Sequence, residues 1–207
     1  MASKTALALV VDRSGSMRPI ANVTTDALQE FLNSQKEIDG DLSISTVFFD
    51  TEIEKRDVFV DPRTTEVDLE IYPRGMTALF DAIGTTVSIF SENIAKLDED
   101  KKPDVVIVVI ATDGLENSSK EYTRDKIAEI IKEKQNEGWK FVFLAANQDA
   151  VLTAEGLNIG NESALTYSAN AAGVSSVMRS ASKYVSNVRA YKQAGFTDSD
   201  REQSLKD

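Results

Sequence analysis

Apolar runs alternate with amphipathic stretches along almost the whole chain. Strands are expected where apolar, β-branched and aromatic residues gather, at 6–11, 42–49, 53–60, 105–111, 140–146 and 164–167. The run that begins at Val105 has six apolar β-branched residues in succession, which is typical of a strand covered on both faces of a parallel sheet. The stretch 53–60 alternates, carries charges and follows a turn at Asp50 and Thr51, which predicts an antiparallel edge strand.

Helices are expected between these strands. Apolar residues recur at helical spacing within 20–38, 79–97, 127–131 and 174–188, and a short helix is expected at 150–155. Glu137 and Gly138 are expected to end the third of these helices. The alternation of strands and helices predicts an α/β fold: a doubly wound, mostly parallel six-stranded sheet with one antiparallel edge strand and helices on both faces.

The domain organisation follows from length and continuity. The chain has 207 residues and shows neither internal repeats nor a long linker. We therefore expect a single domain over residues 1–192 and a polar C-terminal tail over 193–207. The tail is expected to be peripheral, and residues 197–205 within it have the pattern of a short capped helix.

Composition excludes several classes of function. The net charge is −11 and no basic patch is evident, so nucleic-acid binding is not expected. The apolar run at 6–11 is too short for a signal peptide or a membrane span, so we expect a cytoplasmic protein without membrane contact. Cysteine and histidine are both absent, which removes thiolate chemistry and histidine-dependent hydrolases.

The loop after the first strand is the first candidate for chemistry. In a doubly wound sheet, ligands bind beyond the carboxyl ends of the strands. This loop reads Asp12-Arg13-Ser14-Gly15-Ser16 and contains neither of the common glycine-rich phosphate motifs. One carboxylate and two hydroxyls are hard oxygen ligands that suit Mg²⁺. The alternative is that the two serines only cap the helix that follows.

Two further segments favour the metal-binding interpretation. Thr77 lies at the expected start of the second long helix, and Asp113 follows the most apolar strand. All three segments are expected to meet at the same edge of the sheet.

These residues resemble the metal-ion-dependent adhesion site of the von Willebrand factor A (vWA) family, which includes the integrin inserted domains. The family uses a D-x-S-x-S loop, a distant Thr and a distant Asp, which correspond here to Asp12, Ser14, Ser16, Thr77 and Asp113. The resemblance covers residues 4–192 and is closest to small stand-alone bacterial or phage members. Many members have a glycine at the position before the threonine, where this chain has methionine.

The resemblance implies a non-enzymatic protein-binding module. A bound Mg²⁺, with Mn²⁺ or Ca²⁺ as alternatives, is completed by a Glu or Asp carboxylate of a partner protein. Two other functions stay open: a metal-dependent hydrolase or phosphatase, and an adaptor for an AAA+ ATPase or a stress-response complex. A hydrolase would need a base within hydrogen-bond reach of a metal-bound water, and only Asp12, Asp113, Asp81 or Glu116 could serve.

Other polar residues near these segments have open roles. Asp81 either orients a metal-bound water or simply benefits from the dipole at the helix start, and we favour the dipole. Glu116 and Asn117 either line the rim of the site or lie in a solvated loop. Arg13 faces either solvent or a partner's carboxylate, and we favour solvent. Asp50 is expected to be an ordinary turn residue.

Overall fold

A six-stranded sheet forms the centre of the molecule. The structure is a computed structural model that describes residues 3–146 and 150–206; positions 1, 2 and 207 of the predicted domain and tail lie outside them. The strands are β1 (Lys4–Asp12), β2 (Asp41–Phe49), β3 (Ile53–Val60), β4 (Val105–Thr112), β5 (Lys140–Ala146) and β6 (Ala164–Tyr167). Their order is β3-β2-β1-β4-β5-β6. Within the described residues, β2 and β3 form the only antiparallel pair, which confirms the predicted mixed sheet and edge strand.

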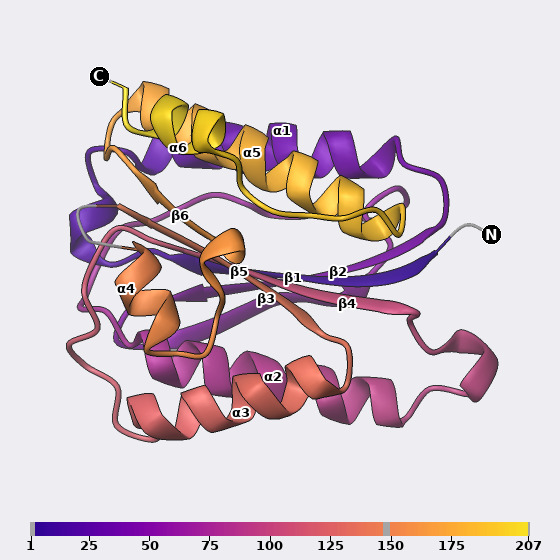
Figure 1. Cartoon of the computed structure of the whole chain (residues 1–207). Coiled ribbons are helices and arrows are strands. Elements are labelled where there is room, and N and C mark those ends of the chain that lie inside the picture. Colours follow the sequence, from indigo (N-terminus) through magenta and orange to yellow (C-terminus); the bar gives the residue numbers. More distant parts are fainter. Residues whose placement is uncertain (1–2, 147–149, 207) are drawn as a thin grey trace.

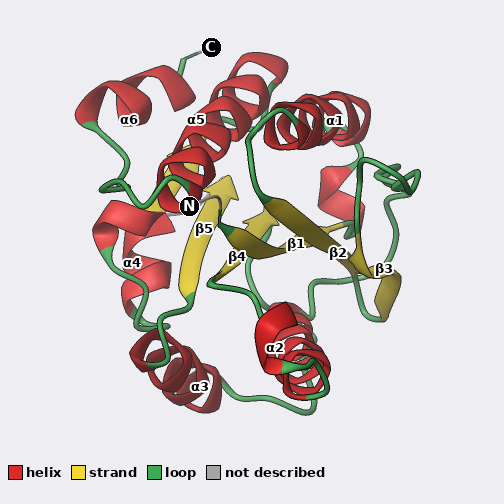
Figure 2. Ribbon diagram, turned by 90° about the vertical axis from the view of Figure 1, so that its right-hand side faces the viewer, coloured by secondary structure: helices red, strands yellow, loops and turns green. Residues whose placement is uncertain are grey.

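Helices cover both faces of the sheet, as predicted. The helices are α1 (Ala21–Lys36), α2 (Leu79–Ala95), α3 (Arg124–Asn136), α4 (Ala150–Glu155), α5 (Ala171–Arg189) and α6 (Asp198–Ser204). Figure 2 shows α1, α5 and α6 on one side of the strands and α2 and α3 on the other. Among residues 3–146 and 150–206, no helix has the length and apolar character needed to span a membrane.

The central strand β1 contributes side chains to the hydrophobic clusters on both faces of the sheet. Its residues alternate between two hydrophobic clusters, with Leu7 and Leu9 on the side of α1 and α5 and Ala8 and Val10 on the side of α2 and α3. Successive side chains of a strand point to opposite faces, so a continuous apolar run supplies both clusters at once. The carboxyl ends of the parallel strands all lie at the left in Figure 1, where the loops of interest gather.

The polar C-terminal segment packs more closely than its composition suggests. Its helix α6 begins with a capping box, in which Thr197 and Asp200 satisfy each other's backbone amides. Phe196 is buried, with its ring centroid 5.3 Å from that of Tyr184 on α5. The Ser204 hydroxyl donates to the Thr166 carbonyl at 2.7 Å. A few well-placed contacts therefore join this segment to β6 and α5, although most of its residues are polar.

This packing predicts that Phe196→Ala destabilises the whole domain. Removing a buried phenylalanine ring leaves a cavity, and the expected loss is about 3 kcal/mol in the free energy of unfolding. Urea denaturation followed by circular dichroism measures it, with Leu205→Ala as a control because Leu205 is half exposed. A change within about 0.5 kcal/mol, the range of ordinary surface substitutions, would show that the segment is peripheral after all.

Candidate metal centre

Three loops converge at the carboxyl edge of the sheet. The first loop begins at Asp12, the last residue of β1, and continues into a short 3₁₀ helix, Gly15–Met17. Asp113 follows the last residue of β4, and β1 and β4 are adjacent parallel strands, which brings their carboxyl ends together. Thr77 lies in the third loop, two residues before α2 begins at Leu79.

The side-chain oxygens of the five predicted residues form one connected group. The Ser14 and Ser16 hydroxyl oxygens are 3.0 Å apart, and the Ser16 hydroxyl donates to Oδ1 of Asp113 at 2.7 Å. A Cβ atom built onto Gly114 would lie 3.1 Å from Oγ1 of Thr77, 3.5 Å from Oγ of Ser16 and 3.9 Å from Oδ2 of Asp12. Oxygens from all three loops therefore face the same small region, and glycine at position 114 leaves it accessible to them.

The helix-capping alternative for the two serines does not account for this geometry. Ser14 occupies the N-cap position of the short 3₁₀ helix, but its side chain makes no capping hydrogen bond. Its hydroxyl instead contacts that of Ser16. The hydroxyls are thus directed toward the other candidate ligands.

Burial disfavours the ionised forms of the Asp12 and Asp113 carboxyls. Burial raises the pKa of Asp12 from its ordinary value of 3.8 to about 6, although hydrogen bonds from the Thr112 hydroxyl and the Ser14 amide and hydroxyl oppose the rise. Burial likewise raises the pKa of Asp113, against the hydrogen bond from Ser16. Two buried carboxyls held near neutral hydroxyls favour a nearby positive charge, since a cation stabilises their ionised forms.

The donor set fits a hard divalent cation. It combines two carboxylates with three hydroxyls, all oxygen ligands of the kind that Mg²⁺ and Mn²⁺ accept. Among the residues that the structure describes, no group of three or more Asp, Glu, His or Cys side chains is placed to hold a metal. The structure brings the five oxygens together, while their ligation of a metal stays a prediction.

The residues whose roles the sequence left open hold the loops in place. Asp81 accepts hydrogen bonds from the backbone amides of residues 120–122, at 2.7–3.0 Å. Glu116 accepts from the Phe80 amide at 3.0 Å and from the Ser119 hydroxyl at 2.7 Å. Oδ1 of Asn117 accepts from the Thr77 amide at 2.9 Å. Together these contacts fasten the loop after β4 to the start of α2, which fixes Thr77 beside Asp113.

The expectation that Arg13 faces solvent is wrong. Its side chain is only 5% exposed, and Nε lies 2.8 Å from Oδ2 of Asp50, whose side chain is 2% exposed. The guanidinium also contacts Glu54 on β3. Asp50 is therefore a buried ion-pair partner of Arg13 rather than an ordinary turn residue. Local sequence could not show this, because the partners lie on a separate hairpin.

Comparison with solved structures identifies the fold. No protein-family model and no curated protein sequence matches the chain. The vWF domain of the type V pili tip protein Mfa5 from Porphyromonas gingivalis superposes with a TM-score of 0.67 at 10% identity, covering 96% of this chain and 99% of that one. A von Willebrand factor type A structure from Catenulispora acidiphila gives 0.60 at 12% identity, covering 89% and 43%.

The chain has the von Willebrand factor A fold. A third similar structure is proximal thread matrix protein 1 from the mussel byssus with a zinc-occupied MIDAS motif, at a TM-score of 0.60 and 16% identity. That match covers 89% of this chain and 46% of the mussel protein, so the chain spans just under half of that relative's length. The fold resemblance anticipated from the D-x-S-x-S loop, Thr77 and Asp113 is therefore confirmed.

Sequence reasoning missed one residue that supports the candidate site. The Thr112 hydroxyl donates to Oδ2 of Asp12 at 2.6 Å, while the Ser14 amide donates to Oδ1 at 2.6 Å. These two bonds hold both oxygens of the Asp12 carboxylate in a set orientation. The available signal was the position of Thr112 next to Asp113 at the end of a strand, where its side chain points to the neighbouring strand end.

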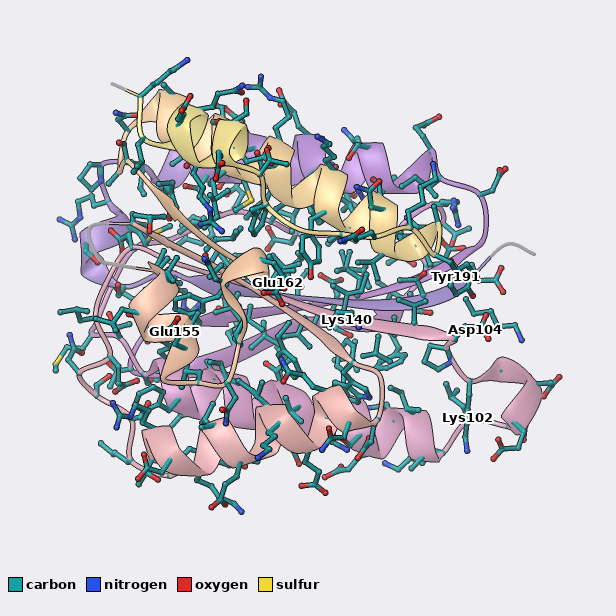
Figure 3. The ribbon with its side chains drawn as sticks, in the orientation of Figure 1. Lys102, Asp104, Lys140, Glu155, Glu162 and Tyr191 are labelled. Carbon is teal, nitrogen blue, oxygen red and sulfur yellow. The ribbon has the colours of Figure 1, made fainter. Side chains whose placement is uncertain are left out.

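A sizeable cavity lies elsewhere in the described part of the chain. It has a volume of about 690 Å³ and is lined by residues such as Val105, Trp139 and Lys140, where β4 and β5 begin, and Tyr191 after α5. In Figure 3, Asp104, Lys140 and Tyr191 lie toward the right, away from the carboxyl ends of the strands. Its charged lining residues, Asp104, Lys140, Glu162 and Lys192, are of mixed sign. Size alone therefore does not make it the functional site.

Proposed function

We propose that this protein is a divalent-cation-dependent protein-binding module. Asp12, Ser14, Ser16, Thr77 and Asp113 would hold the cation, with Mg²⁺ preferred and Mn²⁺ or Ca²⁺ as alternatives. The observation that carries the proposal is the approach of the Thr77, Ser16 and Asp12 oxygens to one point beside Gly114. When bound, such a cation supplies a positive charge that accepts an additional oxygen ligand from outside the protein.

A partner carboxylate is the natural external ligand. Three of the five donors are neutral hydroxyls. If Asp12 and Asp113 act mainly through bound water, a divalent cation keeps much of its positive charge and attracts an acidic Asp or Glu side chain. Ser16 is exposed, as are Met76 and Leu115 in the adjoining loops, with 52% and 65% of their surfaces accessible. Exposed side chains beside a cluster of polar oxygens suit contact with another protein. Among the similar structures, Mfa5 is a pili tip protein, and the mussel protein has zinc in its MIDAS motif.

A non-enzymatic role is favoured over a metal-dependent hydrolase or phosphatase. Asp81 and Glu116 were candidate bases, but both carboxylates accept backbone hydrogen bonds from the loop after β4. A base must reach a reacting water, and these two groups are directed at amides instead. We further propose that the module acts in the cytoplasm, where an AAA+ ATPase or a stress-response complex is one kind of partner.

Isothermal titration calorimetry tests the metal site. The wild-type protein is expected to bind Mg²⁺ and Mn²⁺, and Asp12→Ala to show little or no heat of binding. Asp57→Asn serves as a control because Asp57 lies on β3, hydrogen-bonded to Thr46 and outside the three loops. Equal affinities in wild type and Asp12→Ala would refute the assignment of the site.

A second experiment tests what the site binds. Partner proteins from the native host should be recovered with Mg²⁺ present and lost when EDTA is added. The same preparation should leave generic phosphoester and ester substrates intact in the presence of Mg²⁺ or Mn²⁺. Metal-dependent turnover that disappears in Asp12→Ala would instead favour the hydrolase.

A further inference from the structure

We propose that Asp50 is a positioning residue of the metal centre, which ties the Asp12–Ser16 loop to the loop that carries Thr77. The inference deepens the proposed function and rests on it. Asp50 lies in the turn between β2 and β3 and supplies no oxygen to the candidate cation site. Its carboxylate instead contacts one arginine from each of the two loops.

The ionic contacts are centred on a single oxygen atom. Oδ2 of Asp50 lies 2.8 Å from Nε of Arg13 and accepts a hydrogen bond from Nε of Arg74 at 2.8 Å. Oδ1 accepts from the Glu52 amide at 2.7 Å, which holds the carboxylate in the turn. Arg13 lies between the candidate ligands Asp12 and Ser14, and Arg74 lies three residues before Thr77. One buried carboxylate therefore joins both ligand-bearing segments.

Backbone contacts repeat the same three-way connection. The Ala78 amide donates to the Asp50 carbonyl at 2.9 Å, and the Arg74 amide donates to the Arg13 carbonyl at 2.9 Å. The Gly15 amide donates to the Gly75 carbonyl at 3.2 Å, which joins the two loops directly. These backbone contacts bring the three segments together, and the Asp50 carboxylate keeps the two loops in a fixed position relative to each other.

Gly75 shows how closely the segments approach. Its φ angle is +67°, and a Cβ atom at this position would lie 2.9 Å from Oγ1 of Thr51 and 3.2 Å from Cβ of Asp50. Such contacts leave no space for a side chain, and the positive φ favours glycine independently. At Gly75, which comes one residue before Met76 and two before Thr77, the loop that carries Thr77 therefore packs directly against the Asp50 turn.

Charge neutralisation explains why a carboxylate is needed here. Without the charge on Asp50, Arg13 and Arg74 would repel each other across the junction, and Arg13 would be buried with Glu54 as its remaining acidic contact. Buried charges that lose a partner are strongly unfavourable, so the two loops would separate. Separation moves Ser14 and Ser16 away from Thr77, which weakens a site that depends on all three hydroxyls.

The Arg74→Gln variant separates positioning from simple electrostatics. If Asp50 and Arg74 act only through long-range charge, removing the positive Arg74 should strengthen cation binding, and removing the negative Asp50 should weaken it. If they position the loops, both Arg74→Gln and Asp50→Asn weaken binding. The Arg74 side chain is more than half exposed, so Arg74→Gln is expected to fold even where Asp50→Asn does not.

The experiment combines two measurements on full-length protein. By calorimetry, Mg²⁺ affinity is expected to fall about tenfold in Asp50→Asn and severalfold in Arg74→Gln. Losing a residue that orients a metal ligand lowers metal affinity by about 10- to 100-fold, and we expect the low end here because both residues act through neighbours of the ligands. Glu52→Gln is the matched control, because it removes only the exposed acidic partner of Arg74. Tighter Mg²⁺ binding by Arg74→Gln, or unchanged binding by both variants, would overturn the inference.

Hydrogen exchange of the metal-free protein distinguishes this inference from the proposed function. The Gly15 and Ala78 amides should exchange severalfold faster in both variants than in wild type, while amides within the β1–β4 ladder keep their rates. Unchanged exchange at Gly15 and Ala78 overturns the positioning role even if Mg²⁺ binds. A wild-type protein that binds no divalent cation overturns the proposed function, and faster exchange in the variants would still support the loop junction.

Discussion

Asp113→Ala and Thr77→Ala are expected to abolish cation binding and partner binding while the metal-free fold stays nearly intact. Loss of an outer-shell partner alone can lower metal affinity about 100-fold, and loss of a direct ligand should cost at least as much. Both side chains lie in loops at the edge of the sheet, so their removal deletes no large apolar contact. Asp113→Ala also removes one of two neighbouring buried carboxylates that repel each other without a cation.

Calorimetry, thermal melts and partner recovery together check this expectation. In EDTA, the melting temperatures of wild type and both variants should agree within a few degrees. With Mg²⁺ at 100 times its dissociation constant, only wild type should gain about 2.7 kcal/mol of stability by mass action. Glu121→Gln is the charge control, since it removes an exposed acid near the loop without removing a candidate ligand. Partner binding that persists in EDTA would contradict the carboxylate-to-metal mechanism.

Metal-free protein is expected to lose stability as pH rises from about 4 to above 6, because of Asp12. Folding raises the pKa of this carboxyl from 3.8 to about 6, chiefly through burial. The folded state therefore binds more protons than the unfolded state between these values, and the free energy of unfolding falls with pH. At about 1.4 kcal/mol per pKa unit, the loss attributable to Asp12 is on the order of 3 kcal/mol.

Asp12→Asn isolates this contribution. The amide cannot ionise, so the difference in unfolding free energy between wild type and Asp12→Asn should change by that amount between pH 4 and pH 7. Urea titrations in EDTA at several pH values measure it, and Asp113 contributes in the same direction in both proteins. A pH-independent difference would mean that Asp12 ionises in the folded state as readily as in the unfolded state.

Periodicity alone determined most of the fold. The predicted ranges 53–60, 140–146 and 164–167 coincide with β3, β5 and β6, and the apolar run at 105–111 differs from β4 by one residue. These patterns are reliable because burial on one or both faces of a strand imposes its own spacing on the side chains. The meeting of the Asp12, Thr77 and Asp113 segments was also predictable, since each lies at or near the end of an element whose direction the alternation fixes; the choice of five ligands came from the resemblance to the vWA family and stays a prediction.

Tertiary structure decided the roles of the charged residues around the site. Arg13 and Glu54 are 41 positions apart in the sequence. Asp81 lies 39 positions or more from the residues whose backbone amides donate hydrogen bonds to it. A charged side chain in a loop is solvated unless a partner is brought to it, and local sequence contains no record of that partner. Asp50 is the clearest case: its neighbours in the chain describe a turn, whereas its contacts with Arg13 and Arg74 exist only because the β2–β3 hairpin packs between two loops. Strand pairing, which places distant segments side by side, is the physical step that sequence patterns do not contain.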